Sequence, residues 1–270
     1  MNRKLIFRVS VFFLMILLCG ASKKQEIPYI VDFSKRFVRV DTNLYADKYE
    51  TTIKDFQLFL REKREAGADC SLLIYDSTCW RHKLSYNEPY VEYYFSYPAF
   101  ADFPICCVSY YAANEFCKWL TEKYEKSTIK KKHKKVVFRL PTETEFIKAA
   151  ISIYDSTKIF YPWGHNWLFD CKKGKFCNYH DEGCLFYLKC RNRTYSGGSD
   201  YTLPVRSFQP NPYGIYNIVG NVSEMIQKEG ITMGGDWNSF GYDVTIRSKQ
   251  KYEKPSATVG FRVYMEIIEF

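Results

Sequence analysis

The spacing of hydrophobic residues predicts three helices in the first part of the chain. Over residues 51–65 and 109–125, apolar side chains recur every three or four positions and so share one helix face. These apolar positions are Ile53, Phe56, Leu60, Ala112, Phe116, Trp119 and Leu120. A third helix should begin at Thr142, because Thr142 and Glu145 have the spacing of a capping box, in which each side chain accepts a hydrogen bond from the other residue's amide.

The pattern changes in the C-terminal part, where glycine and proline interrupt the hydrophobic runs. Turn-forming residues occur at 211–214, 230, 234–235 and 241. Such punctuation is typical of irregular loops joined by short strands. Helices early in the chain and strands late in it predict an α+β fold, a single irregular domain with little regular structure, rather than a doubly wound sheet.

The first 21 residues have the pattern of a secretory signal: a basic start, an almost wholly apolar stretch at 9–18, and small residues. Cleavage after Ala21 would leave residues 22–36 as a short leader and release the protein. A lipoprotein signal, cut before Cys19, would instead attach it to the cell envelope (periplasm or outer membrane) through an acyl chain. An uncleaved anchor is the third reading, although the apolar stretch is short for a membrane span.

Composition and charge further limit the kinds of protein and of binding partner that are possible. The chain has 270 residues, 46% of them hydrophobic, which excludes disorder as the main state. Its formal charge of +9 is local, since the signal carries three positive charges and a run from Lys130 to Lys135 carries five. That run is either a patch for anionic lipid, glycan or nucleic acid, or a solvated loop. No aromatic residue interleaves the lysines, so we expect a loop and no nucleic-acid partner.

Ten cysteines are many for a reducing compartment. We expect Cys70 and Cys79 to close a local loop. The insert that contains Cys171, Cys177, His180, Cys184 and Cys190 permits zinc binding or disulfides; its spacing matches no standard zinc knuckle, which favours disulfides. The mature chain cut after Ala21 has nine cysteines, so at least one thiol should remain unpaired.

Several segments, taken in order, resemble the sulfatase-modifying-factor family, whose founding activity is that of the formylglycine-generating enzyme. They lie at 47–53, 108–119, 138–150, 161–164, 211–224, 234–237 and 259–262. The resemblance runs from about Phe37 to about Tyr264. It implies one domain over 37–270, related to C-type lectin folds, with inserts near 66–104 and 171–200.

The resemblance also identifies what this chain lacks. The family's enzyme oxidises a client cysteine with oxygen, using copper(I) held by two cysteines between its Gly-Gly-Ser and Gly-Phe-Arg motifs. Here residues 234–260 contain no cysteine: Ser239 and Val244 stand roughly at those positions, and Asp236 replaces the serine. The side chains of Ser239 and Val244 cannot bind copper(I) as a thiolate does. We therefore expect no copper in this chain, and the resemblance does not imply that it has the family's catalytic activity.

Calcium is the cofactor that the resemblance does imply. At one calcium loop, Asn221 and Glu224 would supply side chains, and Val219 and Val222 would supply carbonyl oxygens. The alternative is a buried turn held by hydrogen bonds without metal. A second family site would use an asparagine and an aspartate, which Asn178 and Asp200 match loosely.

Three functions remain open. The first is a non-catalytic, secreted or envelope-attached domain that binds a protein or glycan partner; residues 255–262 are similar to those of gliding-motility and secretion-associated envelope lipoproteins. The second is a formylglycine-generating oxidase rebuilt around Cys106, Cys107 or Cys117, which a solvent-open cysteine pair beside Trp237 would favour. The third is an anionic-lipid or nucleic-acid binder that uses the lysine run.

Overall fold

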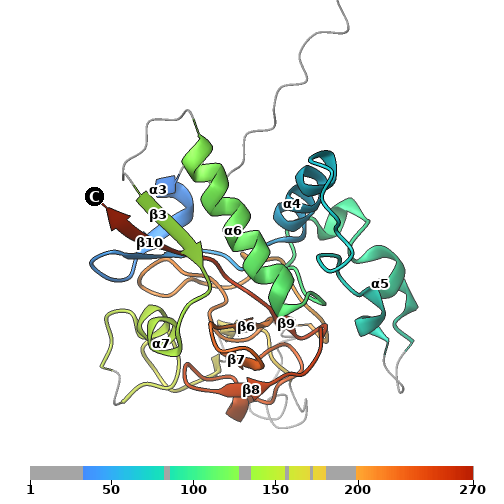
Figure 1. Cartoon of the computed structure of the whole chain (residues 1–270). Coiled ribbons are helices and arrows are strands. Elements are labelled where there is room, and N and C mark those ends of the chain that lie inside the picture. The colour runs from blue at the N-terminus through green and yellow to red at the C-terminus, as the bar shows by residue number, and fades with distance from the viewer. Residues whose placement is uncertain are drawn as a thin grey trace, which may run out of the picture.

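The computed structural model describes residues 33–81, 86–127, 135–155, 158–170, 173–180 and 199–269. Two small sheets lie one above the other, and the longer helices pack around them (Figure 1). The predicted signal, most of the leader, the lysine run except Lys135, and Cys171, Cys184 and Cys190 lie outside the described residues.

The first sheet joins the two ends of the described chain. Its strands, in spatial order, are β1 (Phe37–Arg39), β2 (Leu44–Asp47), β10 (Tyr264–Glu269) and β3 (Lys135–Arg139). All neighbours are antiparallel, and Tyr264 lies opposite both Ala46 and Arg139. The last strand therefore holds the N-terminal strands and the middle of the chain together.

The expectation that strands follow helices is wrong for β1 and β2, which precede the first long helix. Each has only three or four residues, so neither shows the alternation by which a strand is recognised in a sequence. Their pairing partner, β10, comes from the far end of the chain.

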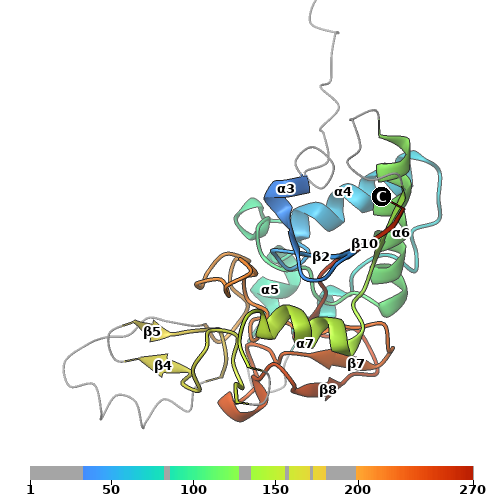
Figure 2. The same ribbon diagram turned by 90° about the vertical axis from the view of Figure 1, so that its left-hand side faces the viewer.

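The second sheet is built from the glycine-punctuated C-terminal part, as the turn signals predict. Its order is β8 (Lys249–Lys251), β7 (Ile231–Met233), β6 (Ser223–Met225) and β9 (Val259–Gly260), with β6 and β9 parallel. A two-stranded hairpin of β4 (Phe169–Asp170) and β5 (Gly174–Lys175) projects from the rest of the molecule (Figure 2).

The three predicted helices are confirmed as α4 (Ile53–Glu65), α6 (Tyr110–Lys126) and α7 (Glu143–Ile151). Thr142 caps α7 through the predicted capping box with Glu145. Thr52 and Asp55 form a second capping box at the start of α4.

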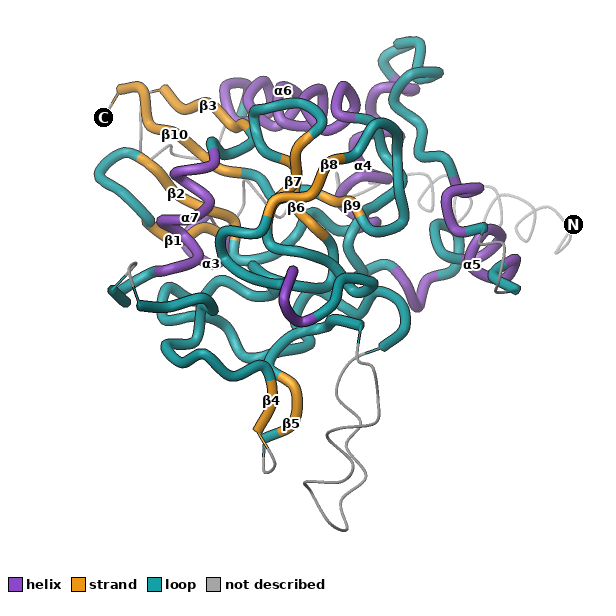
Figure 3. The backbone as a smooth tube through the Cα atoms, turned by 90° about the horizontal axis from the view of Figure 1, so that it is seen from below, coloured by secondary structure: helices purple, strands orange, loops and turns teal. Residues whose placement is uncertain are grey.

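The structure adds short helices that periodicity does not reveal. These are α3 (Phe33–Arg36), η1 (Ser77–Trp80), α5 (Glu88–Tyr93), η2 (Pro98–Phe100) and η3 (Gly241–Asp243). The part that carries α5 lies to one side of the two sheets (Figure 3). No helix in the described ranges is long and apolar enough to cross a membrane.

Aromatic side chains fill the core between α4, α6 and the first sheet. Phe56, Phe116 and Phe261 are fully buried, with the Phe56 and Phe116 rings stacked at 5.8 Å and Phe261 edge-on to Phe116 at 5.5 Å. A second core surrounds α7 and includes Phe146 and Val244. Core packing thus accounts for many of the abundant aromatic residues, and several of the others gather at one groove.

Candidate functional site

A groove of about 570 Å³ lies where several short segments meet: residues 79–81 of η1 and its C-cap, Asn87, His180, residues 200–201, residues 237–238 and residues 256–258. None of these segments is a long helix or strand. Their positions depend on hydrogen bonds between loops and on ring packing.

Aromatic rings form one wall of the groove. The rings of Trp80 and Trp237 stack with centroids 6.2 Å apart, and Tyr201 lies 5.5 Å from Trp237. The indole N–H of Trp237 donates to the Ala257 carbonyl at 3.1 Å, and the Tyr201 hydroxyl donates to the Asn87 side chain at 2.7 Å. These bonds hold the rings in place, and the partly exposed Tyr201 and Trp237 offer apolar surface beside the polar groups of the groove, while Trp80 is buried behind them.

Charged and polar groups of both signs surround the rings. Arg81 is exposed and pairs with Glu88 at 2.8 Å, while Asp200 is exposed and His180 is partly exposed. Such a mixture can form hydrogen bonds with a polar ligand around an apolar centre.

A tight loop presents Trp237 to the groove. Gly235 has a φ of +71°, and a Cβ built on it would lie 2.7 Å from the Asp243 carbonyl oxygen, so only glycine fits. The carboxylate of Asp236 then accepts a hydrogen bond from the Asn238 amide at 2.9 Å. Burial raises the pKa of Asp236 to about 6.

The two positions that correspond to the family's copper ligands do not form a metal site. Val244 is fully buried in the second core. Ser239 stabilises the loop, since its hydroxyl accepts from the Asp236 amide at 3.2 Å and its carbonyl accepts from the His180 amide at 2.9 Å. A serine hydroxyl and an apolar valine side chain do not fit copper(I), which prefers soft sulfur ligands.

Three thiols nevertheless reach this side of the molecule. Cys79 is partly exposed and lines the groove, while Cys106 and Cys107 are fully buried with their sulfur atoms 3.7 Å apart. The Cys79 thiol donates to the Pro255 carbonyl at 3.1 Å. The neighbouring Cys107 thiol, followed by burial, raises the pKa of Cys79 well above its usual range. Burial, followed by the hydrogen bond with Cys106, does the same for Cys107.

The predicted loop closed by Cys70 and Cys79 is not formed. All six cysteines within the described ranges are free thiols: the Cys79 thiol donates to the Pro255 carbonyl and the buried Cys70 thiol donates to the Ala68 carbonyl. The cap of η1 is fixed to a different segment, since the Asp76 amide donates to the Cys107 carbonyl at 2.8 Å. Cys117 is also a free thiol, buried in α6.

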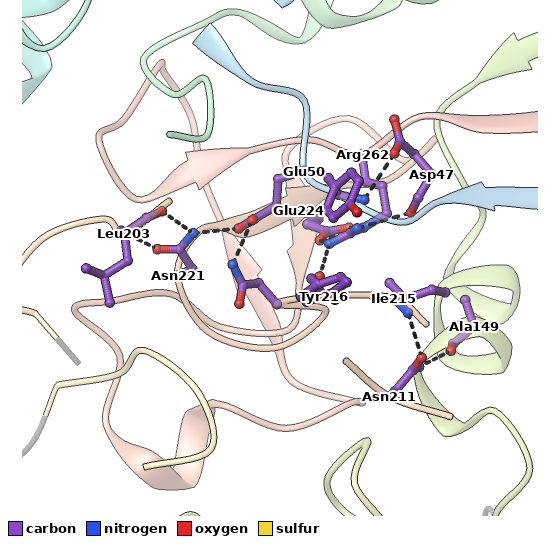
Figure 4. Close-up of polar contacts among 12 residues, drawn as sticks. Asp47, Glu50, Ala149, Leu203, Asn211, Ile215, Tyr216, Asn221, Glu224 and Arg262 are labelled. Carbon is purple, nitrogen blue, oxygen red and sulfur yellow. Dashed lines mark hydrogen bonds and ion pairs between the residues drawn. The ribbon is translucent and has the colours of Figure 1, made fainter. Parts of the chain in front are cut away.

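A buried polar network joins Glu50, Glu224 and Arg262 to their neighbours (Figure 4). Arg262 is fully buried, and its guanidinium donates to both carboxylate oxygens of Glu224 at 2.6–3.1 Å. It also donates to the main-chain oxygens of Asp47 and Tyr216. A forked, charge-assisted contact of this kind is geometrically specific and joins β6 to the segment before β10.

Glu50 extends this network toward the groove loops. Its two carboxylate oxygens accept from the side-chain amides of Asn221 at 2.9 Å and Asn217 at 3.1 Å (Figure 4). Burial raises the pKa of Glu50 to about 8. The buried side-chain oxygen of Asn217 has no hydrogen-bond partner among the residues that the structure describes. If the Asn217 amide were turned over, this oxygen could accept the proton of a neutral Glu50.

The first predicted calcium loop is built as a hydrogen-bonded turn. Glu224 binds Arg262, and the Asn221 side chain joins Glu50 to both main-chain polar groups of Leu203. Val219 and Val222 are buried beside them. Both Glu224 oxygens accept from the Arg262 guanidinium, so calcium could use this carboxylate only by displacing that ion pair.

The second predicted pair is not a joint ligand set either. The side chain of Asn178 is buried and accepts from the Ser199 amide at 2.7 Å, whereas Asp200 is exposed at the groove. Within the described ranges no group of three or more His, Cys, Asp or Glu side chains could hold a metal ion. Calcium binding thus remains a prediction from the resemblance.

The profile of the "Sulfatase-modifying factor enzyme 1-like domain" matches residues 17–267. The chain belongs to this family. Its sequence is 38% identical over 87 residues to the formylglycine-generating enzyme of Thermomonospora curvata, a match that covers 32% of this chain and 25% of that enzyme. It is 27% identical over 158 residues to the serine/threonine-protein kinase pkn1 of Chlamydia pneumoniae, covering 58% of this chain and 17% of the kinase.

Solved structures of sulfatase-modifying-factor type share the fold. PvdO from Pseudomonas aeruginosa superposes with a TM-score of 0.55 at 17% identity, over 83% of this chain and 80% of PvdO. CarF gives a TM-score of 0.55 at 18% identity, over 83% of this chain and 86% of CarF. The α+β domain with this family's fold is therefore confirmed.

Sequence reasoning located some parts of the site and missed others. It singled out Trp237, Asp200 and His180. Asp200 and His180, however, were considered as metal ligands and not as parts of a groove. It missed the contribution of Cys79 and Trp80, which come from the expected insert. The only signal was a cysteine next to a tryptophan, which does not show what the pair would face.

Proposed function

We propose that this chain is a non-catalytic member of the sulfatase-modifying-factor family that binds a protein partner in the groove beside Trp237. The observation that carries the proposal is a rigid aromatic wall with a polar rim, next to a segment 234–260 that supplies no thiol. The site can therefore hold a ligand, but it lacks the groups with which the family's enzyme activates oxygen.

The chemistry of the rim favours a peptide segment as the ligand. Arg81 and Asp200 provide opposite charges, and Asn238 provides a side-chain amide at the same opening. An extended peptide presents alternating side chains and main-chain amides, which such groups can recognise. Rings with polar neighbours also suit sugars, so a glycan is the competing outcome.

A two-arm binding experiment tests this proposal. The mature protein is panned against a displayed library of random peptides, and in parallel it is screened on an array of oligosaccharides. We expect enrichment of related peptides, with binding reduced at least about tenfold by Trp237→Ala, because loss of a central aromatic anchor costs 1–2 kcal/mol or more.

The control is Tyr97→Ala, which removes an exposed tyrosine from a separate apolar pocket near α5 and should leave binding unchanged. Enrichment on the glycan array alone would replace the peptide by a sugar as the ligand. Absence of Trp237-dependent binding in both arms would contradict the proposal.

Secretion or envelope attachment is part of the same proposal and is supported by the N-terminal pattern. The intact mass of the protein isolated from its native host tests it. Loss of residues 1–21 would indicate release, and a chain that begins at Cys19 with an added acyl group would indicate a lipid anchor. A mass that includes the full signal would contradict both.

A rebuilt oxidase is a second candidate, because Cys79 does line the groove beside Trp237 and is not locked in a disulfide. Against it, Cys106 and Cys107 are fully buried, and Cys117 lies in the α6 core. If this candidate were right, Cys79→Ser should abolish oxidation of a sulfatase-motif peptide by the protein.

A further inference from the structure

A second pocket lies beside α5, in the part of the molecule to one side of the two sheets (Figure 3). It has a volume of about 400 Å³ and shares no lining residue with the groove. Its lining is almost entirely apolar and consists of aromatic rings and one proline: Pro89, Tyr90, Tyr93, Tyr97 and Phe100. The function proposed above does not use this pocket.

Local turns bring these side chains together. Pro89 lies in the first turn of α5, where a proline is tolerated because the first amides of a helix have no partner within it. Tyr93 follows one turn later, on the same face of the helix. The Tyr97 amide then donates to the Tyr93 carbonyl at 2.9 Å, and the Phe100 amide donates to the Tyr97 carbonyl at 3.0 Å. The pocket is thus formed within one short stretch of chain.

A buried ring fixes the inner side of the pocket. Tyr94 is fully buried, and its ring lies 5.2 Å from that of Phe100 and 6.4 Å from that of Tyr90. Tyr93 and Tyr97, in contrast, are 46% and 59% exposed. The pocket therefore has a fixed floor and a rim of two tyrosines that are open to solvent. Exposed apolar surface gathered in this way marks an interaction site.

The lining of the pocket favours a proline-rich segment over other ligands. A sugar would need several hydrogen-bonding groups inside the pocket, and an added β-strand would need a free sheet edge, which these helical turns do not offer. A proline-rich segment in the polyproline II conformation has no internal hydrogen bonds, so its carbonyls are free to accept from tyrosine hydroxyls. Its proline rings pack on aromatic side chains.

Charge near the pocket favours basic residues beside those prolines. Residues 86–105 contain three acidic side chains and no lysine or arginine. Two of the acids, Glu88 and Asp102, form exposed ion pairs. The third, Glu92, is exposed and directly precedes Tyr93 in α5. Complementary charges speed association and select among partners, so a cationic segment is favoured.

We propose that this pocket binds a proline-rich segment of a partner protein, with lysine or arginine residues beside the prolines. The prolines pack on the rings of Tyr93 and Tyr97, the tyrosine hydroxyls donate to carbonyls of the segment, and Glu92 attracts its basic residues. The proposal does not rest on the groove beside Trp237, because the two sites have different lining residues and different ligands.

The test probes the full mature protein with an array of synthetic peptides. One set has a Pro-x-x-Pro core flanked by arginine, a second has alanine in place of both prolines, and a third has the same core flanked by glutamine. We expect the first set to bind, and the alanine set to bind at least about tenfold more weakly, because its anchoring rings are lost. The glutamine set should also bind more weakly, and added salt should weaken binding of the arginine set by screening the exposed acids.

Variants at the rim connect this binding to the pocket. Tyr97→Ala should weaken binding of the arginine-flanked set at least about tenfold, and its exposed position makes loss of folding unexpected. Tyr97→Phe keeps the ring and loses only the hydroxyl, so its affinity should be intermediate. Tyr242→Ala is the matched control, since Tyr242 is 91% exposed and lies on η3 outside the pocket; it should bind as the wild type does.

Three results would overturn the proposal: no binding of the proline sets, equal binding of the proline and alanine sets, or binding that survives Tyr97→Ala. Tyr97-dependent binding that appears only on an array of oligosaccharides would also overturn it, because the ligand would then be a sugar. Ligands of the groove depend on Trp237 instead of Tyr97. Failure of this proposal can therefore be distinguished from failure of the proposed function.

Discussion

At the scale of single residues, burial changes the chemistry of the carboxylates in the core. Glu50 has a pKa raised to about 8, chiefly by burial and despite the nearby Arg262. A carboxyl whose pKa is raised on folding contributes stability below its unfolded pKa, and this contribution is lost as the pH rises through the folded value. The window for Glu50 therefore runs from about pH 4.5 to about pH 8.

The variant Glu50→Gln tests whether stability falls as the pH rises through this window. The free energy of unfolding, measured by urea denaturation, should fall between pH 5 and pH 8 by on the order of 3 kcal/mol more in the wild type than in the variant. Replacement of the exposed Glu253 by glutamine serves as the control and should leave the wild-type slope unchanged. If the free energy of unfolding changed with pH in the same way in the wild type and in Glu50→Gln, the pKa of Glu50 would not be raised by folding.

Arg262 should be far more important for stability than an exposed arginine. Arg262→Met leaves Glu224 buried without its partner, which costs about 3–5 kcal/mol of unfolding free energy. Arg81→Met, which breaks the exposed and solvent-screened pair with Glu88, should leave stability almost unchanged. Equal losses in the two variants, measured by urea denaturation at pH 7, would contradict the network described above.

Residue identity alone could not predict these pairings. Asn221 and Glu224 stand out in the sequence as oxygen donors, and calcium is a reasonable expectation for them. Their actual partners, Glu50 and Arg262, lie on segments far away in the chain. A guanidinium and a divalent cation satisfy the same carboxylate, so the sequence does not distinguish them.

At the scale of elements, the long helices were predictable because each carries its own signals. Periodicity identifies α4 and α6, and the Thr142 capping box identifies the start of α7. The short strands β1 and β2 and the turn η1 carry no such local signal. They form because distant segments pair with them, which is why the groove that η1 lines was not foreseen.

The loop that presents Trp237 depends on Gly235. A Cβ there would lie 2.7 Å from the Asp243 carbonyl, whereas one on Gly67, with a similar φ of +76°, would meet nothing within 4 Å. Gly67→Ala should cost about 1 kcal/mol for the left-handed backbone alone. Gly235→Ala should cost at least about 1 kcal/mol more, because overpacking adds to that strain.

Thermal unfolding of the two alanine variants measures this difference. Gly235→Ala should also weaken any ligand binding that depends on Trp237, and Gly67→Ala should not. If both variants lost the same stability and Gly235→Ala bound normally, the loop would not be the rigid support that the structure describes.

At the scale of the whole molecule, the sequence was sufficient to predict the family and the α+β fold. It was sufficient to predict only some of the residues of the site. The order of short motifs was sufficient for the family, because each motif forms part of the frame, such as the Glu224–Arg262 pair. The groove is assembled from several short segments, and its thiol comes from an expected insert. No single segment contains the information that brings Cys79 and Trp237 together.

The central claim is that this frame retains a ligand groove but not the family's oxidation of cysteine. The most direct measurement incubates the purified protein with copper(I), oxygen and a peptide that carries the sulfatase cysteine motif, and follows the peptide by mass spectrometry, with a formylglycine-generating enzyme as the positive control. The account predicts no conversion of the cysteine above a protein-free blank. Stoichiometric or catalytic formylglycine formation by this chain would contradict it.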